Sequence, residues 1–266
     1  MKKCMIVFMF AVSSGLWAAG GHDKELAEIK EGQRIEAKAS WWGFNKEDST
    51  QFLQAAIDSG VKKLVVDNTG DDWVIEPVSL ADDQEIVFEK GVVVIAKKNS
   101  FKKTTDSLFT ARCKKNIILR GEGGVVLKMR KTDYHDVKFY AKGEWRNAIS
   151  LLSSENIKIQ NLTLLSSGGD GIYIGRVNGE KMNYCKNVLI DNVVCDDNNR
   201  QGISVISAEN LIVRNSVFKN TRGAPPEAGI DFEPNEQGER LVNCLVENCR
   251  FEENNGKGID MFLKTD

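Results

Sequence analysis

The sequence predicts an all-β solenoid, a parallel β-helix of about seven coils with a short capping helix near its N-terminal end. Two observations predict this fold class. One pattern, Asn-apolar-x-apolar-x-Asn followed later by Gly-Ile-x-apolar, occurs four times in the second half of the chain. The first half carries short Val- and Ile-rich runs bounded by Gly, Asp or Asn, which are typical of strands.

The four copies share a constant internal spacing. Their two Asn residues are always five positions apart, and the second Asn precedes the Gly by 10, 10, 14 and 10 residues. The shortest distance between copies is 23 residues, enough for one three-strand turn. The copies are Asn156–Asn161 with Gly171-Ile172, Asn187–Asn192 with Gly202-Ile203, Asn210–Asn215 with Gly229-Ile230, and Asn243–Asn248 with Gly258-Ile259.

The N-terminal part divides into three segments. Residues 1–20 resemble a secretory signal, with two lysines, an apolar run too short to span a bilayer and small residues at the end. We therefore expect a secreted or periplasmic protein. Residues 21–40 are expected to be a linker, and residues 41–266 to form the β-helix domain.

Local patterns place the first elements of that domain. Residues 50–60 predict an amphipathic helix that Asp48 or Ser49 caps and Gly60 ends. Strands are then expected at 63–66, 73–75, 85–88, 91–96, 116–119 and 125–128.

In the repeats, we expect Asn161, Asn192, Asn215 and Asn248 to form a column at one tight bend, since Asn tolerates left-handed backbone and its amide can bond to the next coil. Side chains alternate along the strand that follows. We expect Ile172/Ile174, Ile203/Val205, Ile230/Phe232 and Ile259/Met261 to point inward. Tyr173, Ser204, Asp231 and Asp260 would then form one outward column, and Gly175, Ile206, Glu233 and Phe262 the next.

Three insertions lengthen the longer repeats, at residues 176–183, 220–226 and 235–240. All three flank the Gly-Ile-x-apolar strand. Insertions gathered on one side of a solenoid usually build the walls of its binding face. The face that carries Asp231 is therefore the predicted groove.

Charge and cysteine content exclude several classes of function. Of 36 basic residues, Lys2 and Lys3 lie in the signal segment, which leaves 34 against 38 acidic ones. This balance indicates neither nucleic acid nor an anionic membrane as partner. Five cysteines follow residue 20, so they cannot all pair with one another, and free thiols or one disulfide are both compatible with the count. No zinc-ligand spacing occurs, no cofactor is expected, and calcium is the one metal that clustered acids could bind.

The stack resembles the right-handed parallel β-helix of the pectin lyase-like superfamily. Residues 42–50 (WGFNKEDST) with the helix that follows, and residues 80–91 (LADDQEIVFEKG), resemble the entry segment and capping helix of polygalacturonase-type glycoside hydrolases. The resemblance covers residues 40–262. It implies a polysaccharide as the partner.

The catalytic motifs of that family are matched in part. Residues 169–174 (GDGIYI) correspond to its Gly-Asp-Asp-x-Ile-x-Ile pattern, with Asp170 kept and Gly171 at the second Asp. Residues 200–204 (RQGIS) stand where Gly-His-Gly-Ile-Ser is expected, with Gln201 at the His position. The downstream Arg-Ile-Lys pattern is replaced by residues 228–234 (AGIDFEP).

The outward columns also bring acids together. Asp231 and Asp260 lie on adjacent coils, about 4.8 Å apart, and Asp231 and Glu233 on one strand, about 6.5–7 Å apart. These separations suit retaining and inverting glycosidases respectively. Close carboxylates also raise each other's pKa, which favours a general acid. A solvated acidic face is the plain alternative.

We predict Asp231 as nucleophile or base, with Glu233 or Asp170 as acid. Arg200 would clamp a uronate carboxylate or pair with Asp196, Asp197 or Glu227. Residues 134–147 could fold over the groove. The predicted substrate contacts are Arg200, Asp260, Tyr173, Arg146 and Glu144.

Three functions fit these features. The first is an exported glycoside hydrolase that acts on a polysaccharide, the second a uronate lyase or epimerase, and the third a glycan-binding β-helix without catalysis. The last strand, at residues 258–262, is followed by four residues, and the oligomeric state is open. Because an uncovered solenoid end exposes strand edges, we expect either a covering partner or a chain that continues in a longer protein.

Overall fold

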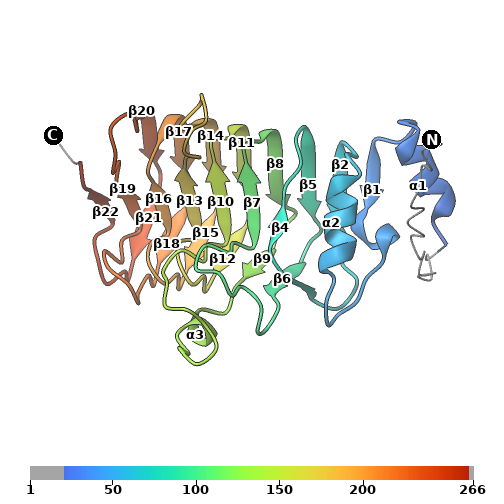
Figure 1. Cartoon of the computed structure of the whole chain (residues 1–266), viewed down its shortest axis with the longest axis horizontal. Helices are drawn as coiled ribbons and strands as arrows, with labels where there is room; N and C mark the ends of the chain where they lie inside the picture. The colour runs from blue at the N-terminus through green and yellow to red at the C-terminus, as the bar shows by residue number, and fades with distance from the viewer. Residues whose placement is uncertain (1–20, 264–266) are drawn as a thin grey trace, which may run out of the picture.

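Three parallel sheets surround one elongated core in the computed structural model, which describes residues 21–263 (Figure 1). Each coil adds one strand to each sheet, so that every strand pairs with its counterpart one coil away. The predicted signal segment at residues 1–20 lies outside the described residues. The predicted coil number is confirmed, because two of the sheets have seven strands and the third has eight.

The sheets are called A, B and C in the order in which a coil visits them. Sheet A contains β1 (Glu36–Lys38), β2 (Lys63–Val66), β5 (Gln84–Phe88), β8 (Lys115–Gly121), β11 (Glu155–Gln160), β14 (Cys185–Asp191), β17 (Ala208–Arg214) and β20 (Leu241–Glu247). Sheet B contains β3 (Trp73–Ile75), β6 (Val93–Ala96), β9 (Val126–Lys128), β12 (Thr163–Leu165), β15 (Val194–Asp196), β18 (Val217–Lys219) and β21 (Arg250–Glu252). Sheet C contains β4 (Val78–Ser79), β7 (Phe109–Arg112), β10 (Ile149–Leu152), β13 (Ile172–Gly175), β16 (Ile203–Val205), β19 (Ile230–Phe232) and β22 (Ile259–Met261).

Helices are short and lie outside the stack. They are α1 (Asp23–Lys30), the 3-10 helix η1 (Ala39–Trp42), α2 (Thr50–Asp58) and α3 (Lys131–Tyr134). The predicted capping helix is α2, where Asp48 accepts the Thr50 N–H at 3.0 Å and Gly60 follows with φ 71°.

The predicted linker over residues 21–40 carries α1 and β1, so the β-helix begins before residue 41. Ile29 of α1 is buried against the core, and Ala37 of β1 pairs in register with Leu64 of β2. Three alternating residues are too few to indicate a strand in the sequence, which explains why β1 was not expected.

Both Asn positions of the repeat have left-handed backbone. Asn161, Asn192, Asn215 and Asn248 have φ between 53° and 58°, as predicted for a tight bend. The first Asn of each copy does the same, and its amide bonds to the next coil in a continuous ladder, Asn116–Asn156–Asn187–Asn210–Asn243, with N···O distances of 2.8–3.1 Å. This ladder extends one coil further towards the N-terminus than the sequence pattern indicates.

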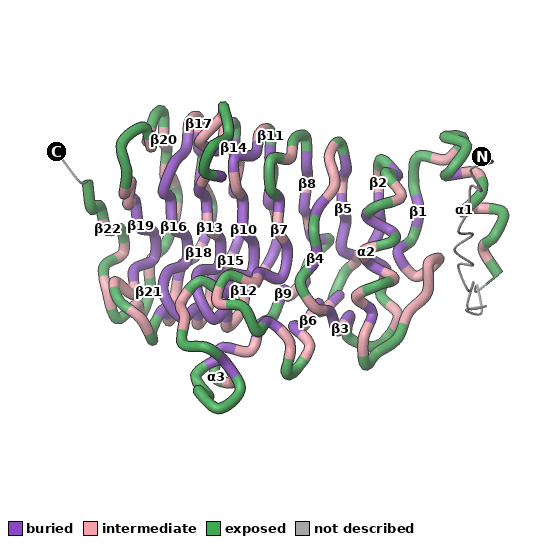
Figure 2. The backbone as a smooth tube through the Cα atoms, viewed as in Figure 1, coloured by how far each residue is buried: buried purple, intermediate pink, exposed green. Residues whose placement is uncertain are grey.

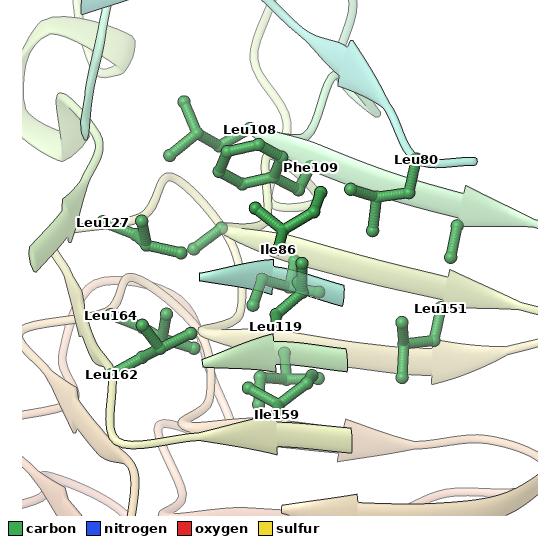
Figure 3. Close-up of a cluster of buried hydrophobic side chains, with 14 of the residues drawn as sticks. Leu80, Ile86, Leu108, Phe109, Leu119, Leu127, Leu151, Ile159, Leu162 and Leu164 are labelled. Atoms are coloured by element: carbon green, nitrogen blue, oxygen red, sulfur yellow. The ribbon is translucent and has the colours of Figure 1, made fainter. Parts of the chain in front are cut away.

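The core consists of aliphatic side chains stacked coil upon coil. Ile86, Leu119 and Ile159 occupy the same register position on successive strands of sheet A, and Figure 3 shows them one above another. Buried residues occur in every strand from β1 to β19, whereas the strands of the last coil, β20 to β22, are exposed or intermediate (Figure 2). The Gly of the repeat is required by close packing, since a Cβ at Gly202 would lie 2.5 Å from the Gly229 carbonyl oxygen.

The predicted inward residues behave as expected except at the last coil. Ile172, Ile174, Ile203, Val205, Ile230 and Phe232 are buried. Ile259 and Met261 are 39 % and 65 % exposed, because no further coil covers β22 in the described residues. The predicted strands of the first half all occur as strands of sheets A and B. The sheet C strands β4, β7 and β10 were not predicted.

Candidate active site

The candidate site lies on the outer face of sheet C, where the predicted outward column is confirmed. Tyr173, Ser204, Asp231 and Asp260 pair in register from β13 to β22. The column continues towards the N-terminus through Ser150, Thr110 and Ser79. We call these seven residues the sheet C column.

Loops from both corners of the coil border this column. Residues 176–183 and 235–240 follow β13 and β19 and join each other, since Arg176 forms ion pairs with Glu236 and Glu239. On the opposite side, residues 220–228 precede β19, and the Ala224 N–H donates to the Asn199 carbonyl at 2.7 Å. The insertions therefore stand where walls were predicted.

A long loop, residues 131–147 between β9 and β10, protrudes from the stack and carries α3 (Figure 1). With the wall at Asn199, Gly223 and Ala224, it encloses a cavity of about 480 Å³. Glu144 and Trp145 of this loop line the cavity. The predicted segment thus does lie beside the groove.

Asp231 stands at the centre of the sheet C column and is 1 % exposed. Gln201 Nε2 donates a hydrogen bond of 2.8 Å to its Oδ2, and the other carboxylate oxygen makes no hydrogen bond within residues 21–263. Burial raises the pKa of Asp231 to about 6, and the nearby Glu233 carboxylate adds to this. Asp231 can therefore exchange a proton near neutral pH.

Arg200 connects the remaining acids of the site. Its guanidinium donates to Glu233 Oε2 at 2.9 Å and to Ser204 Oγ at 3.2 Å. It also lies 4.0 Å from Asp170 Oδ2 and 3.9 Å from Glu144 Oε1. Three carboxylates thus surround one largely buried cation.

These contacts correct two of the predictions for Arg200. The acids that it pairs with are not Asp196, Asp197 or Glu227, since Asp196 pairs with Lys219 and Asp197 with Lys131. Nor does Arg200 present a free guanidinium to a substrate carboxylate, because the protein's own acids already surround it. Its contacts hold Glu233 beside Asp231.

Asp170 is completely buried, so its carboxyl group has no surface that a ligand could contact in this conformation. Neither carboxylate oxygen has a hydrogen-bond partner of good geometry, although Arg200 lies close by. Burial raises the pKa of Asp170 to about 7, against the opposing effect of the Arg200 charge. The Asp170 N–H donates to Asn147 Oδ1 at 2.7 Å, which fixes the backbone there.

Tyr173 and Asp260 lie at the two sides of the acids. Tyr173 packs over Gly175, where a Cβ would lie 2.5 Å from its ring, and burial raises its pKa to about 12. Asp260 lies directly beside Asp231 in the column, as predicted, but its carboxylate accepts 2.7 Å from Lys257 Nζ, which lowers its pKa. The two aspartates are therefore electrostatically different.

Arg146 does not face the groove, contrary to its predicted role in substrate contact. Its side chain is fully buried, and its Nε donates to the Phe101 carbonyl at 2.8 Å. The guanidinium lies 5.4 Å from the ring centroid of Tyr134 and 5.6 Å from that of Tyr140. Arg146 thus stabilises the base of the 131–147 loop.

The roles of Gln201 and Asn147 were not predicted from the sequence. In the sequence, Gln201 only replaces the His of a family motif. In the structure, its side chain donates a hydrogen bond to Asp231. Asn147 has no signal in the sequence, because it precedes a strand that lacks the Gly-Ile pattern. Its contact with Asp170 joins residues that are 23 positions apart in the sequence.

The remaining features concern metal ligands, cysteines and membrane-spanning helices. Within residues 21–263, no cluster of three or more His, Cys, Asp or Glu side chains is arranged to hold a metal ion. Cys113, Cys185, Cys195, Cys244 and Cys249 are all free thiols. Over the same residues, no helix has the length and apolar character needed to cross a membrane.

The family model for the right handed beta helix region matches most of this chain. It matches residues 68–231 and, in a second register, residues 116–265. A search of proteins with curated functions found no significant match.

Solved structures with the same fold include several that are named for carbohydrate chemistry. A candidate glycosyl hydrolase from Parabacteroides merdae is 18 % identical, with a TM-score of 0.60 over 81 % of this chain and 95 % of its own. An iota-carrageenase, solved with iota-carrageenan fragments, is 17 % identical, with a TM-score of 0.63 over 81 % of this chain and 49 % of its own. A tailspike capsular polysaccharide depolymerase of the Acinetobacter baumannii bacteriophage Fri1 is 13 % identical, with a TM-score of 0.62 over 87 % of this chain and 44 % of its own. The chain thus spans about half the length of the last two, and identities this low establish the shared fold alone.

Proposed function

This chain belongs to the family of right-handed β-helix proteins, and we propose that it is an exported glycoside hydrolase whose groove over sheet C binds a polysaccharide. The observation that carries the proposal is the pairing of Asp231 with Glu233. One carboxyl is buried, with a pKa raised to about 6, and the other accepts a hydrogen bond of 2.9 Å from Arg200. Two acids that differ in this way are the usual equipment of a glycosidase.

The environments assign the roles of the two acids. Asp231 is the general acid, because its raised pKa keeps a fraction of it protonated near neutral pH. Glu233 is the general base, because its side chain is partly exposed and its carboxylate accepts a hydrogen bond of 2.9 Å from Arg200. This reverses the roles expected from the sequence.

The geometry of the strand favours inversion over retention. Alternate side chains on one strand lie about 6.5–7 Å apart, a separation that leaves room for a water molecule between acid and base. In the proposed reaction, Asp231 gives its proton to the glycosidic oxygen while Glu233 removes a proton from the attacking water. Both carboxylate oxygens of Asp170 are buried beside Arg200, so we assign Asp170 an effect on the Arg200 charge and no direct part in the reaction.

Elimination is less well supported. A lyase or epimerase needs a positive group to neutralise the uronate carboxylate while the neighbouring proton is removed. Arg200 is the cation nearest to Asp231 among the groups described for this site, and three protein carboxylates already surround it. The proposed hydrolysis requires no further cation at the acids.

A glycan-binding protein without catalysis is the second candidate, and one observation favours it. Asp170 and Asp231 are 0 % and 1 % exposed, so the acids have little access to a ligand unless the surrounding loops move. A binding protein would keep the groove and its walls but would not need exposed acids.

A panel of plant, algal and bacterial polysaccharides tests these functions. New reducing ends without new ultraviolet absorbance from unsaturated uronates support hydrolysis, and both signals together support elimination. Retained glycan binding without either signal would leave the binding protein as the correct reading. Asp231→Asn should remove the activity, whereas Asp71→Asn should not, since the Asp71 carboxylate makes no contact in the described part of the chain.

A further inference from the structure

A second cavity, of about 510 Å³, lies over sheet C on the N-terminal side of the acids. Its floor is the part of the sheet C column formed by Thr110, Ser150 and Tyr173, on β7, β10 and β13. The cavity therefore lies along the same column as Asp231, which stands two coils beyond Tyr173. Trp145 lines this cavity and also the one enclosed by the 131–147 loop, so the two cavities are neighbours.

The lining of this second cavity has the chemistry of a sugar-binding site. The side-chain hydroxyls of Thr110, Ser150 and Tyr173 make no hydrogen bond to any group within residues 21–263, so their capacity is free for a ligand. Trp145 is 43 % exposed and offers an aromatic surface. Free hydroxyls beside an exposed ring can satisfy both the polar edges and the apolar faces of a sugar.

Arg112 is the single charged residue among those that line this cavity. It ends β7 and is exposed, and in the described part of the chain its guanidinium has neither an ion pair nor a hydrogen bond. Arg200 differs sharply, because protein carboxylates surround it. An unpaired guanidinium in a groove is suited to a carboxylate or a sulfate ester, which it can bind through two parallel hydrogen bonds.

The register fixes how far this cation lies from the proposed acids. Arg112 pairs with Leu152 on the next coil, and Leu152 pairs with Gly175 on the coil after that. Glu233 occupies the equivalent position two coils beyond Gly175. Four coil steps of about 4.8 Å separate Arg112 from Glu233, or about 19 Å along the groove. A polymer bound along the groove would span this distance with several sugar units.

We propose that the cavity at Arg112 is a binding site for an anionic sugar unit of the polysaccharide, several units away from the bond held at Asp231 and Glu233. The proposal rests on the proposed function in that the ligand is a glycan that lies along sheet C. It adds that the glycan carries carboxylates or sulfate esters, and it moves recognition of that charge from Arg200 to Arg112.

Binding measurements on the full chain test the proposal without requiring turnover. Calorimetry would compare oligogalacturonates with their methyl esters, and sulfated galactan oligomers with their desulfated forms. We expect the unmodified protein to prefer the charged member of one pair, and the pair that shows the preference identifies carboxylate or sulfate as the ligand group. Arg112→Gln should weaken binding of that charged oligomer about tenfold and change binding of its neutral form less than twofold.

Arg250→Gln is the matched control, because Arg250 is an exposed arginine on sheet B, away from the groove. It should leave both affinities unchanged. Equal binding of charged and neutral oligomers by the unmodified protein would overturn the proposal, and so would an equal loss for both forms in Arg112→Gln or an equal loss in Arg250→Gln. Absence of hydrolysis with the charge preference intact would overturn the proposed function and leave this inference standing.

Discussion

Two polar columns run along this solenoid, and their side chains are satisfied in opposite ways. At the edge of sheet A, each Asn of the ladder from Asn116 to Asn243 bonds to the same residue one coil away, and all but the half-buried Asn210 are exposed. At the corner that precedes sheet C, Asp170 and Gln201 are fully buried, and both oxygens of the first and the amide oxygen of the second lack partners.

This difference indicates that the Asn ladder has a structural role and that the buried acceptors near sheet C have a functional one. In a ladder of identical amides, each donor has an acceptor on the adjacent coil. The ladder therefore contributes stability and leaves no polar group that needs a ligand. Buried acceptors without partners cost free energy that a stable fold would otherwise avoid. Their concentration around Arg200 and Asp231 is therefore the strongest structural reason to place the chemistry on sheet C.

The largest expected effect comes from removing the proposed acid. Asp231→Asn keeps the shape of the side chain and its contact with Gln201, but it cannot donate the proton. We expect hydrolysis to fall about 10²–10⁴-fold in initial-rate assays of reducing ends. An unchanged rate would place the chemistry elsewhere, and thermal unfolding of the variant would show whether the fold is intact.

The ladder can be broken in a way that separates its two contributions. Asn187→Ala removes two amide hydrogen bonds and, on backbone with φ 54°, replaces a residue that tolerates the left-handed region with one that does not. We expect a loss of about 2–4 kcal/mol in the free energy of unfolding, measured by urea titration. Asn187→Gly loses the bonds but tolerates the backbone, so it should lose clearly less; equal losses would mean that the left-handed bend contributes nothing.

The buried acid on sheet C predicts an unusual pH dependence of stability. The folded-state pKa of Asp170 is raised to about 7, above the value near 3.9 of an unfolded chain. Its stabilising contribution is therefore complete below about pH 4 and is lost as the pH rises through about 7. In Asp170→Asn this loss disappears, so the variant should gain several degrees in Tm relative to the parent between pH 4 and pH 8. A constant difference in Tm across that range would contradict the assignment.

The smallest effect concerns the partner of Asp231. Gln201→Leu removes the hydrogen bond of 2.8 Å that lowers the pKa of this carboxyl. We expect the pKa to rise by about one unit, seen as an alkaline shift of the limb that reports the acid in the pH–rate profile. Gln201→Glu would test charge at the same position, and it should raise the pKa further through repulsion.

How far the sequence predicts this molecule depends on the region. The repeats locate the left-handed Asn bends, the inward ladders and the column from Tyr173 to Asp260, because each follows from a fixed spacing. The β4, β7 and β10 strands of sheet C were missed, since no Gly-Ile pair introduces them. Arg112 stands on one of these missed strands, so nothing in the sequence could place it in the groove.

The contacts of the site were harder to predict than its residues. The spacing places Asp231 and Glu233 on one strand, whereas Glu233 directly follows the end of β19. The spacing does not show which acids approach Arg200 across coils. Glu144 reaches Arg200 from a loop 56 residues earlier in the chain. Such contacts depend on how loops of unequal length fold against the stack, and periodicity carries no information about that.

The constant register of the strands has a consequence for how such a groove can diversify. Insertions of eight and ten residues leave the columns aligned, because the extra residues are accommodated at the corners between sheets. The distance between Arg112 and Glu233 can therefore change only in increments of one coil, about 4.8 Å each. The corner loops can therefore vary the local shape of the proposed sugar-binding cavity without altering its distance from the proposed acids.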